Sequence, residues 1–437
     1  MRGRSTILFG FLAVITAGAI ALASPWSRVA KTWGDWSDAA FTACSAVCVT
    51  GLSVVEIGKE YSLIGQIVLI VLVEIGALGL MVLGTFLLVA IGRRLSYASE
   101  FSLMNAYGVA EIRGVKGLIF WVIGSMFVIE GAGAGLLYMR FHDWYLSIFF
   151  SVMSFCNAGF SIYSDSLARF AGDPFVLFTL ACETILGGIG FLVIYNLCTF
   201  KFLRRKSGAK GRLSLHSSVV LRFSLYLTAI TFAAFLLLEW DGVLKNFDWP
   251  QKLWVGFYQA VTPRSCGFTV IPLESMCAST KELYEWMMLI GGAPGSVAGG
   301  MKVTTFAVLI YTILAMCRGE QETIISHRVV SSDVVRESVV IVVALFLFGD
   351  VTYSLLSGLE PMIGTTRLDL YFEAISAITT TGLSIGNTTS ELSKSGRLVI
   401  MAAMLVGRLG ALTIVMMIGA RESKRHVRYP SEELVVG

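Results

Sequence analysis

Charge is scarce in this sequence of 437 residues, because Asp, Glu, Lys and Arg make up only 15% of it. Ordinary globular domains carry about 25% charged residues. Proline is also rare, with 8 residues in the whole chain. The scarcity of charge excludes a water-soluble protein. The hydrophobic content of 55% and the mean hydropathy of +0.74 indicate a protein of many membrane spans, up to a dozen at about 20 residues each.

The residues of common catalytic and metal sites are missing as well. The sequence has 4 histidines, and it contains no HExxH, Walker A or nucleophile-elbow motif. Its 8 cysteines show no CxxC pairs and lie in or beside apolar segments, which indicates small apolar side chains rather than disulfides or zinc ligands. We therefore expect no enzyme activity, no cofactor bound by this chain and no nucleic-acid partner.

Eight long apolar segments, each able to cross a membrane, are separated in pairs by four shorter ones. The long segments are residues 6–24, 62–91, 115–138, 174–200, 219–238, 283–315, 335–358 and 398–420. The shorter ones are residues 37–49, 144–157, 251–264 and 369–380. They are too short to cross a bilayer and too apolar for solvated loops, as is typical of re-entrant segments. The first long segment resembles a signal peptide, but its length favours a retained span.

Each short segment ends in the same pentad, with Gly third, a large apolar residue fourth and a hydroxyl residue fifth. The pentads begin at Val49, Asn157, Ser265 and Thr380, and their glycines are spaced by 108, 108 and 115 residues. So constant a period indicates a fourfold repeat of helix, re-entrant pore helix and helix. The predicted fold is an all-α polytopic membrane protein with four pseudo-symmetric repeats around a central pore. The repeats cover residues 1–91, 92–200, 201–318 and 319–420, followed by a tail, 421–437.

Basic residues indicate the orientation. With the N-terminus inside, the inner segments hold 20 Lys and Arg, whereas the longer outer connections hold 12. This excess agrees with the positive-inside rule. The inner segments are residues 1–5, 92–116, 201–222, 316–337 and 421–437. Both termini are thus expected in the cytoplasm of a bacterial inner membrane, with the pentads facing outside.

Four Gly-centred segments around one axis could form a cation filter. Backbone carbonyls can replace the hydration shell of an ion, and Gly permits the conformations that turn them inward. A single pentad could equally be a turn between helices, but four in register favour a pore. The predicted filter residues are Val49, Thr50, Gly51, Asn157, Ala158, Gly159, Ser265, Cys266, Gly267, Thr380, Thr381 and Gly382.

The pentads, together with the motifs that begin at Glu74, Gly187 and Gly407, resemble the Trk/Ktr/HKT superfamily of potassium transporters over nearly the whole chain. Within it, the sequence is most similar to the branch of KtrB membrane subunits. The resemblance implies a homodimer with one pore per subunit and a cytosolic KtrA-like ring of RCK subunits, which bind ATP or ADP. In the HKT branch, Ser at the first filter glycine accompanies sodium preference. Gly51 at this position therefore favours K⁺, and Na⁺ assistance stays an open hypothesis.

The third repeat differs from the others because ten residues with five Gly and one Pro interrupt its second span. Such a run is unfavourable in a helix. It could be a close helix crossing, but the resemblance implies an intramembrane gate below the filter, and the other second spans carry no such insert. The predicted gate residues are Gly291, Gly292, Ala293, Pro294, Gly295, Ser296, Val297, Ala298, Gly299 and Gly300.

Ionisable residues inside spans are costly and therefore suspected of function. Arg408 matches the basic residue that faces the pore in the family, where its charge would oppose a cation; the alternative is a salt bridge with Glu74 or Glu183. Lys302 could pair with an acid or project to the cytoplasmic mouth. For Glu130 and Asp350 we expect structural roles. The outer acids Asp38, Glu56, Asp143, Asp369 and Glu373 are expected on a solvated surface, or concentrating cations at the entrance.

The sequence thus predicts K⁺ uptake through a gated pore in the membrane. The alternative is a secondary transporter of another cation or small solute, since repeats and broken helices also mark that class. Alternating access would use a site between two halves, whereas this sequence has four similar units.

Overall fold

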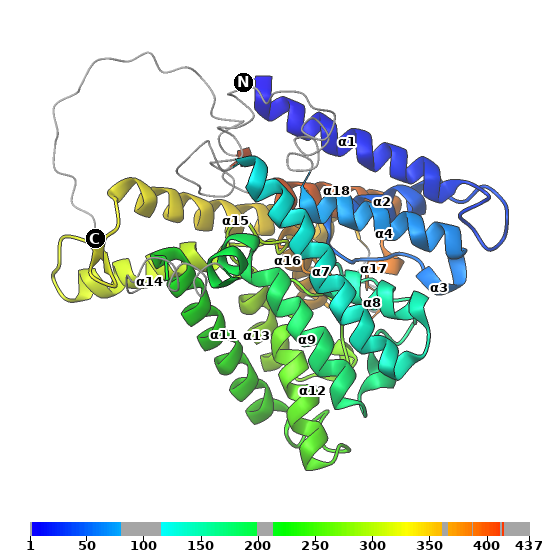
Figure 1. Ribbon diagram of the computed structural model, residues 1–437. Coiled ribbons are helices and arrows are strands. Elements are labelled where there is room, and N and C mark those ends of the chain that lie inside the picture. Colours follow the sequence, from blue (N-terminus) through cyan, green and yellow to red (C-terminus); the bar gives the residue numbers. More distant parts are fainter. Residues whose placement is uncertain are drawn as a thin grey trace.

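Helices form nearly all the regular structure of the protein, as a computed structural model shows (Figure 1). The structure describes residues 2–79, 115–198, 213–360, 366–386, 388–410 and 413–414. Within these residues the only sheet is a two-stranded hairpin, β1 (Ile324–Ile325) and β2 (Arg328–Val329). The predicted all-α fold is therefore confirmed. Most of the basic inner segments, and the tail 421–437, lie outside the described residues.

Four units follow one another, each with a long first helix, a short helix and a second helix. The first unit contains α1 (Arg2–Ala23), α2 (Trp36–Cys48), α3 (Ile57–Glu60) and α4 (Leu63–Leu78). The second contains α7 (Val115–Phe141), α8 (Trp144–Phe155), the 3₁₀ turn Ala168–Phe170 and α9 (Pro174–Ile189). The third contains α11 (Leu215–Glu239), α12 (Trp249–Val261), the 3₁₀ turn Leu273–Ser275, α13 (Ala278–Leu289) and α14 (Val303–Cys317). The fourth contains α15 (Ser332–Leu359), α16 (Arg367–Ile378), α17 (Thr388–Glu391) and α18 (Lys394–Leu409).

The short helices α2, α8, α12 and α16 lie close to the predicted re-entrant segments. Polar side chains fix where each begins: Asp35 and Asp143 accept hydrogen bonds from the first-turn amides of α2 and α8, and α16 begins with a capping box between Thr366 and Asp369. Such caps contribute about 1 kcal/mol each. Beyond the caps, most residues of these helices are buried. The short helices therefore form the core rather than the surface.

The units pack as a closed ring. The second helix of one unit contacts the short helix of the next: α4 packs on α8, α9 on α12, α13 on α16, and α18 back on α2. The first helices lie farther out, and Figure 1 shows α1, α11 and α15 at the rim of the molecule. The sequence order of the units is thus their order around the ring.

The outer helices have the length and apolar surface for a bilayer. Among the described residues, Ile119–Phe141, Leu215–Glu239 and Ser332–Leu359 are long and apolar enough to cross a membrane. Exposed tryptophans begin three of the short helices, namely Trp36, Trp144 and Trp249, as in the aromatic belts of membrane interfaces. The protein is therefore a helical membrane protein.

The second helices are broken, which the sequence did not predict for all of them. Each of α4, α9 and α18 ends at a glycine with positive φ: Gly79 at 74°, Gly190 at 91° and Gly410 at 85°. At Gly190 the chain bends by 99° into the helical residues Phe191–Cys198. The prediction of a continuous span over residues 174–200 is therefore wrong, because glycine permits a left-handed break there.

Candidate ion pathway

The four pentads adopt one backbone conformation. The residue two positions before each pentad glycine has a positive φ, namely Val49 (56°), Asn157 (56°), Ser265 (71°) and Thr380 (50°). The glycines also have positive φ, at 97° for Gly51, 66° for Gly159, 83° for Gly267 and 84° for Gly382. The residue between them has negative φ in each pentad. Alternation of positive and negative φ lets successive carbonyls turn toward one side, as a carbonyl-lined ion path requires.

The pentad glycines meet in a closed ring. A Cβ atom added at Gly51 would overlap the carbonyl oxygen of Ala158, and one at Gly159 would lie 2.8 Å from that of Cys266. One at Gly267 would lie 2.8 Å from the oxygen of Thr381, and one at Gly382 would overlap that of Thr50. In every case the neighbour is the residue just before the next glycine of the ring. We call these four glycines the glycine ring; only a residue without a side chain fits this approach.

Helix ends and polar groups surround the glycine ring. The short helices end three to six residues before the pentad glycines, so their C-terminal carbonyls, which carry partial negative charge, face the pentads that follow them. Buried polar atoms without a partner among the described residues also occur in the pentads, at Thr50 Oγ1, at both side-chain atoms of Asn157 and at Thr380 Oγ1. Such atoms are usually satisfied by water or an ion. The surroundings therefore suit a cation.

The Gly-rich segment, residues 291–300, forms a non-helical loop between α13 and α14. Its Gly299 amide donates to Ser265 Oγ at 3.1 Å, and a Cβ at Gly299 would overlap the Thr379 carbonyl oxygen. On the opposite side, the Ala293 amide donates to the Gly188 carbonyl at 2.8 Å. This Gly-rich loop is therefore held between two pentads and the broken helix α9.

Arg408 fixes the Gly-rich loop from a third side. Its guanidinium donates to the carbonyl oxygen of Val297 at 2.6 Å and to that of Gly76 on α4. The side chain thus joins α18, the loop and the first unit. Lys302 donates to the Ala298 carbonyl at 2.6 Å, so it closes the loop instead of pairing with an acid or projecting to the cytoplasm, as the sequence had suggested.

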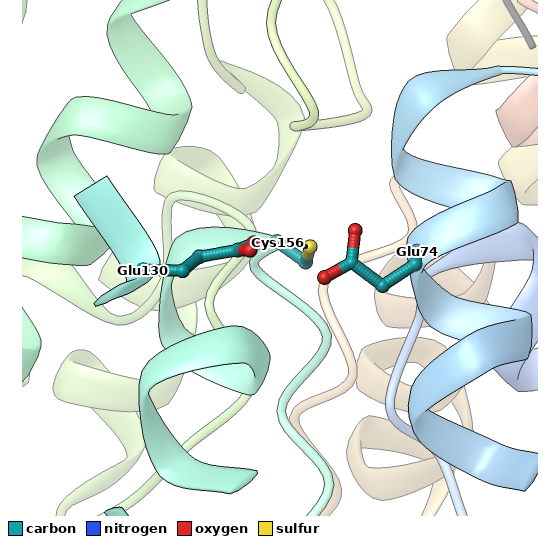
Figure 2. A group of neighbouring side chains, drawn as sticks. All are labelled: Glu74, Glu130 and Cys156. Carbon is teal, nitrogen blue, oxygen red and sulfur yellow. Dashed lines mark hydrogen bonds between the residues drawn. The ribbon is translucent and has the colours of Figure 1, made fainter. Parts of the chain in front are cut away.

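Two glutamates and a cysteine meet between the first two units. One ligand atom from each of Glu74, Glu130 and Cys156 lies within 4.8 Å of the others, and Figure 2 shows both carboxyl groups directed toward the Cys156 sulfur from opposite sides. Glu130 is only 4% exposed. The Cys156 thiol donates to Glu130 at 3.5 Å, and Cys156 directly precedes Asn157, so Glu130 lies beside a pentad. Glu183, one of the two acids considered as a partner of Arg408, accepts a hydrogen bond from Ser151. Asp350 lies on the exposed side of α15.

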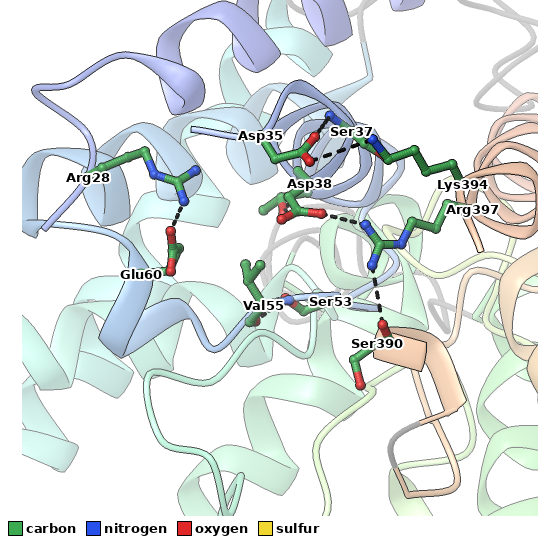
Figure 3. Close-up of polar contacts among 11 residues, drawn as sticks. Arg28, Asp35, Ser37, Asp38, Ser53, Val55, Glu60, Ser390, Lys394 and Arg397 are labelled. Atoms are coloured by element: carbon green, nitrogen blue, oxygen red, sulfur yellow. Dashed lines mark hydrogen bonds and ion pairs between the residues drawn. The ribbon is translucent and has the colours of Figure 1, made fainter. Parts of the chain in front are cut away.

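Two of the outer acids, Asp38 and Glu373, are bound by other side chains, although the sequence predicted that they lie on a solvated surface. Arg397 of α18 donates to Asp38 of α2 at 2.5 Å and to the Ser390 carbonyl at 3.2 Å, while Lys394 lies 3.9 Å from Asp35 (Figure 3). Glu373 is fully buried and accepts a hydrogen bond from Thr389. The expected solvated surface is therefore wrong for Asp38 and Glu373. The ion pairs close the ring between the last unit and the first.

Asp38→Asn is expected to lower the free energy of unfolding by about 1–2 kcal/mol, between the values for exposed and buried pairs. The reason is that the side chains of Arg397 and Asp38 are only 16% and 22% exposed. Thermal unfolding in detergent measures the change. Lys59→Ala is the control, since the Lys59 and Glu56 side chains are 76% and 47% exposed, and it should change stability by less than about 0.5 kcal/mol. Equal effects of the two variants would contradict the prediction.

Three further glycines, each three residues before a helix break, make close backbone contacts that the sequence analysis did not predict. Added Cβ atoms at Gly76, Gly187 and Gly407 would overlap the carbonyl oxygens of Val47, Phe155 and Ile378, respectively. Each of these carbonyls belongs to the residue four positions before a pentad glycine. The sequence does contain an indication of these contacts, because glycine occurs at the same position of three units, at Gly76, Gly187 and Gly407.

The arrangement defines an α-helical transport protein of the membrane, with four backbone segments meeting at one ring. Comparisons with known proteins identify its family. A profile of the TrkH family, described as "Cation transport protein", matches residues 9–429. The chain therefore belongs to the TrkH family of cation transport proteins, which confirms the resemblance seen in the sequence and agrees with the expectation of no enzyme.

Two curated relatives match nearly end to end. The Ktr system potassium uptake protein B of Bacillus subtilis is 33% identical over 99% of this chain and 96% of its own length. The potassium/sodium uptake protein NtpJ of Enterococcus hirae is 30% identical, again over 99% of this chain and 96% of its own length. The crystal structure of the potassium transporter TrkH from Vibrio parahaemolyticus shares the fold, with a TM-score of 0.75 at 16% identity, covering 95% of this chain and 84% of that one.

Proposed function

We propose that this protein takes up K⁺ across the cytoplasmic membrane through a filter formed by the four pentads. The glycine ring is the main support for this proposal, since each of its glycines lies against the carbonyl oxygen of the residue that precedes the next glycine of the ring. A dehydrated K⁺ needs carbonyl oxygens on every side, and four segments in a closed ring supply them. The potassium uptake named for the relatives supports the choice of K⁺.

The charge of the surroundings favours a cation. Four helix C-termini, each equivalent to about half a negative charge, are directed at the pentads, while Asp and Thr caps stabilise the opposite ends. The proposed filter therefore gains negative potential from backbone dipoles, without a carboxylate that would hold the ion too strongly for it to leave.

The Gly-rich loop is the proposed gate. It is attached by hydrogen bonds to Ser265, Gly188 and Arg408, so it can be released only when several weak contacts break together. Each contributes about 0.5–1.5 kcal/mol, or more where the donor is charged. Such contacts suit a segment that moves on a signal from a partner.

Arg408→Gln is expected to increase K⁺ flux about tenfold or more, since each 1.4 kcal/mol removed from a barrier is a factor of ten. The variant removes both a positive charge and the hydrogen bond to Val297. Arg408→Lys separates these effects, because Lys keeps the charge but lacks the planar fork that reaches two carbonyls. Flux of the Lys variant close to that of Gln would assign the effect to the loop contact. A folded Gln variant with unchanged or lower flux would contradict the proposal.

The complete assembly is also a proposal. In this proposal the protein is a homodimer in a bacterial inner membrane, with both termini in the cytoplasm. A cytosolic RCK-type ring is joined to it, and ATP or ADP binds to that ring rather than to this chain. The basic inner segments and the relatives named as Ktr system proteins B and D support a cytosolic partner. The name of NtpJ, a potassium/sodium uptake protein, supports assistance by Na⁺.

The decisive experiment is growth rescue of a bacterium that lacks potassium uptake. The chain should restore growth at low K⁺, more strongly with a candidate regulatory subunit. Adding or omitting Na⁺ in the same assay tests sodium assistance. Failure to rescue by protein that is present and folded in the membrane would exclude K⁺ uptake, and uptake of a metabolite instead would favour alternating access.

A further inference from the structure

A cavity of about 410 Å³ lies between the second and third units. Its walls are mainly apolar and come from α9, α11 and α12, with Ile185, Ile189, Leu221, Leu225, Phe257 and Val261 among them. Leu225 is 67% exposed, so the cavity opens on the membrane-facing side of α11. An apolar space reached from the bilayer suits a hydrocarbon chain rather than a polar metabolite.

Among the described residues, Arg264 is the one charged group that lines this cavity. The guanidinium of Arg264 donates to Ser224 O at 3.2 Å, to Ser224 Oγ at 3.2 Å, to Thr228 Oγ1 at 3.3 Å and to Gly291 O at 3.5 Å. All these acceptors are neutral, and in the described part of the chain no Asp or Glu forms an ion pair with Arg264. Its Nε has no acceptor there. Arg264 is partly buried, and a partly buried cation held only by neutral groups attracts an anion, because removing a charge from water is costly without a counter-charge.

The same arginine contacts the Gly-rich loop. Gly291, whose carbonyl accepts from Arg264, is the first residue of the loop, and Gly292 lines the cavity. The next residue after Arg264 is Ser265, which binds the Gly299 amide. A group that engages the guanidinium would therefore compete with a contact that holds the loop.

We propose that this cavity binds a long-chain fatty acid, with the chain along the apolar wall and the carboxylate on Arg264, and that binding loosens the Gly-rich loop. The regulatory part rests on the proposed function, whereas the binding does not. Ser224 and Thr228 lie near the middle of the 25-residue helix α11, far from either membrane surface. A fatty acid reaches this depth because it crosses the bilayer as the neutral acid, while a phospholipid head group is held at the interface. An arginine and a carboxylate then form two parallel hydrogen bonds.

Binding is tested on the full chain in liposomes with a photoreactive diazirine analogue of palmitate, and the attached peptides are identified by mass spectrometry. We expect labelling on α11 or α12 that palmitate displaces and that palmitate methyl ester, which has the same chain without the charge, displaces about tenfold less well, as for loss of one charge-assisted contact. Equal displacement by the ester, labelling elsewhere only, or displacement by phosphatidylglycerol instead of palmitate would overturn the proposal.

Variants keep the test independent of folding defects at Arg264. Leu225→Trp should fill the open side of the cavity and reduce labelling about tenfold or more, the effect of a lost 1.4 kcal/mol. Leu237→Trp is the matched control, because Leu237 lies on the same helix, is 83% exposed and is not part of the cavity wall. Arg264→Gln should abolish the preference for palmitate over its ester. Unchanged labelling of Leu225→Trp would contradict the site.

Flux separates the two parts of the inference. Palmitate should raise K⁺ flux of the wild type severalfold and leave that of Leu225→Trp unchanged, while the ester has little effect on either. Specific labelling without any change in flux would overturn the regulatory part alone. A wild type that labels specifically but never transports K⁺ would contradict the proposed function and leave the binding site intact.

Discussion

Serine in place of Gly51 is expected to lower the discrimination of K⁺ over Na⁺ by about tenfold or more. Gly51 has φ of 97°, and an added Cβ would overlap the carbonyl oxygen of Ala158. A side chain in such a conformation costs about 1–3 kcal/mol, and 1.4 kcal/mol corresponds to a factor of ten. The collision moves the carbonyl that would bind the ion, so strain appears as lost selectivity. Flux of K⁺ and Na⁺ into liposomes, measured with the same protein, gives the ratio.

Gly319→Ser is the matched control for this experiment. Gly319 also has a positive φ, 72°, but an added Cβ there would contact nothing within 4 Å. The control therefore carries the backbone strain without the collision, and its selectivity should equal that of the wild type. Gly382→Ser should act like Gly51→Ser. Its added Cβ would overlap the carbonyl oxygen of Thr50, the residue of the first pentad that precedes Gly51. A folded Gly51→Ser protein with unchanged selectivity would refute the filter assignment.

The four glycines of the glycine ring could be predicted from the sequence, because the same residue is required at the same position of each repeat. Gly51, Gly159, Gly267 and Gly382 stand at one place in four similar pentads, and a backbone that must approach another backbone leaves glycine as the residue that fits. The short helices were predicted to within three residues at each end for a related reason, since each lies between a cap and a pentad.

Other features depend on contacts that no local pattern contains. The breaks at Gly79, Gly190 and Gly410 fall inside apolar runs, where glycine is common in membrane helices and hydropathy does not change. The pairing of Asp38 with Arg397 joins residues 359 positions apart in the sequence. The acceptors of Arg408 and Lys302 are backbone carbonyls, which every residue has, so composition could indicate costly charges but could not identify their partners.

The Gly-rich loop and the broken second helices belong to one arrangement. The loop touches α9 next to its break, at Gly187 and Gly188, and the amide of Phe191 beyond the break donates to the Gly295 carbonyl at 3.2 Å. The break at Gly190 thus exposes backbone groups that the loop satisfies, as non-helical backbone at membrane depth requires. Movement of the loop would therefore be transmitted to α9 directly.

Deletion of residues 292–299 is expected to raise K⁺ flux without a partner about tenfold or more, if the loop adds at least 1.4 kcal/mol to the barrier. The structure suits this deletion, because the ends of the loop already meet: the Gly291 amide donates to Met301 O at 2.9 Å, the Met301 amide to Leu289 O at 3.0 Å, and a Cβ at Gly291 would lie 3.4 Å from Gly300 Cα. Joining Gly291 to Gly300 therefore needs little movement of α13 or α14.

A point variant checks the deletion without shortening the chain. In Gly299→Ala the new methyl group would overlap the Thr379 carbonyl oxygen and the Thr380 hydroxyl, so the loop must move away from the fourth pentad and flux should rise in the same direction. Gly124→Ala is the control, since a Cβ at Gly124 on α7 would contact nothing within 4 Å and flux should be unchanged. Size-exclusion chromatography and thermal unfolding establish that each protein is folded. If the folded deletion protein conducts no faster than the wild type while Gly299→Ala conducts more slowly, the loop supports the filter and does not gate it.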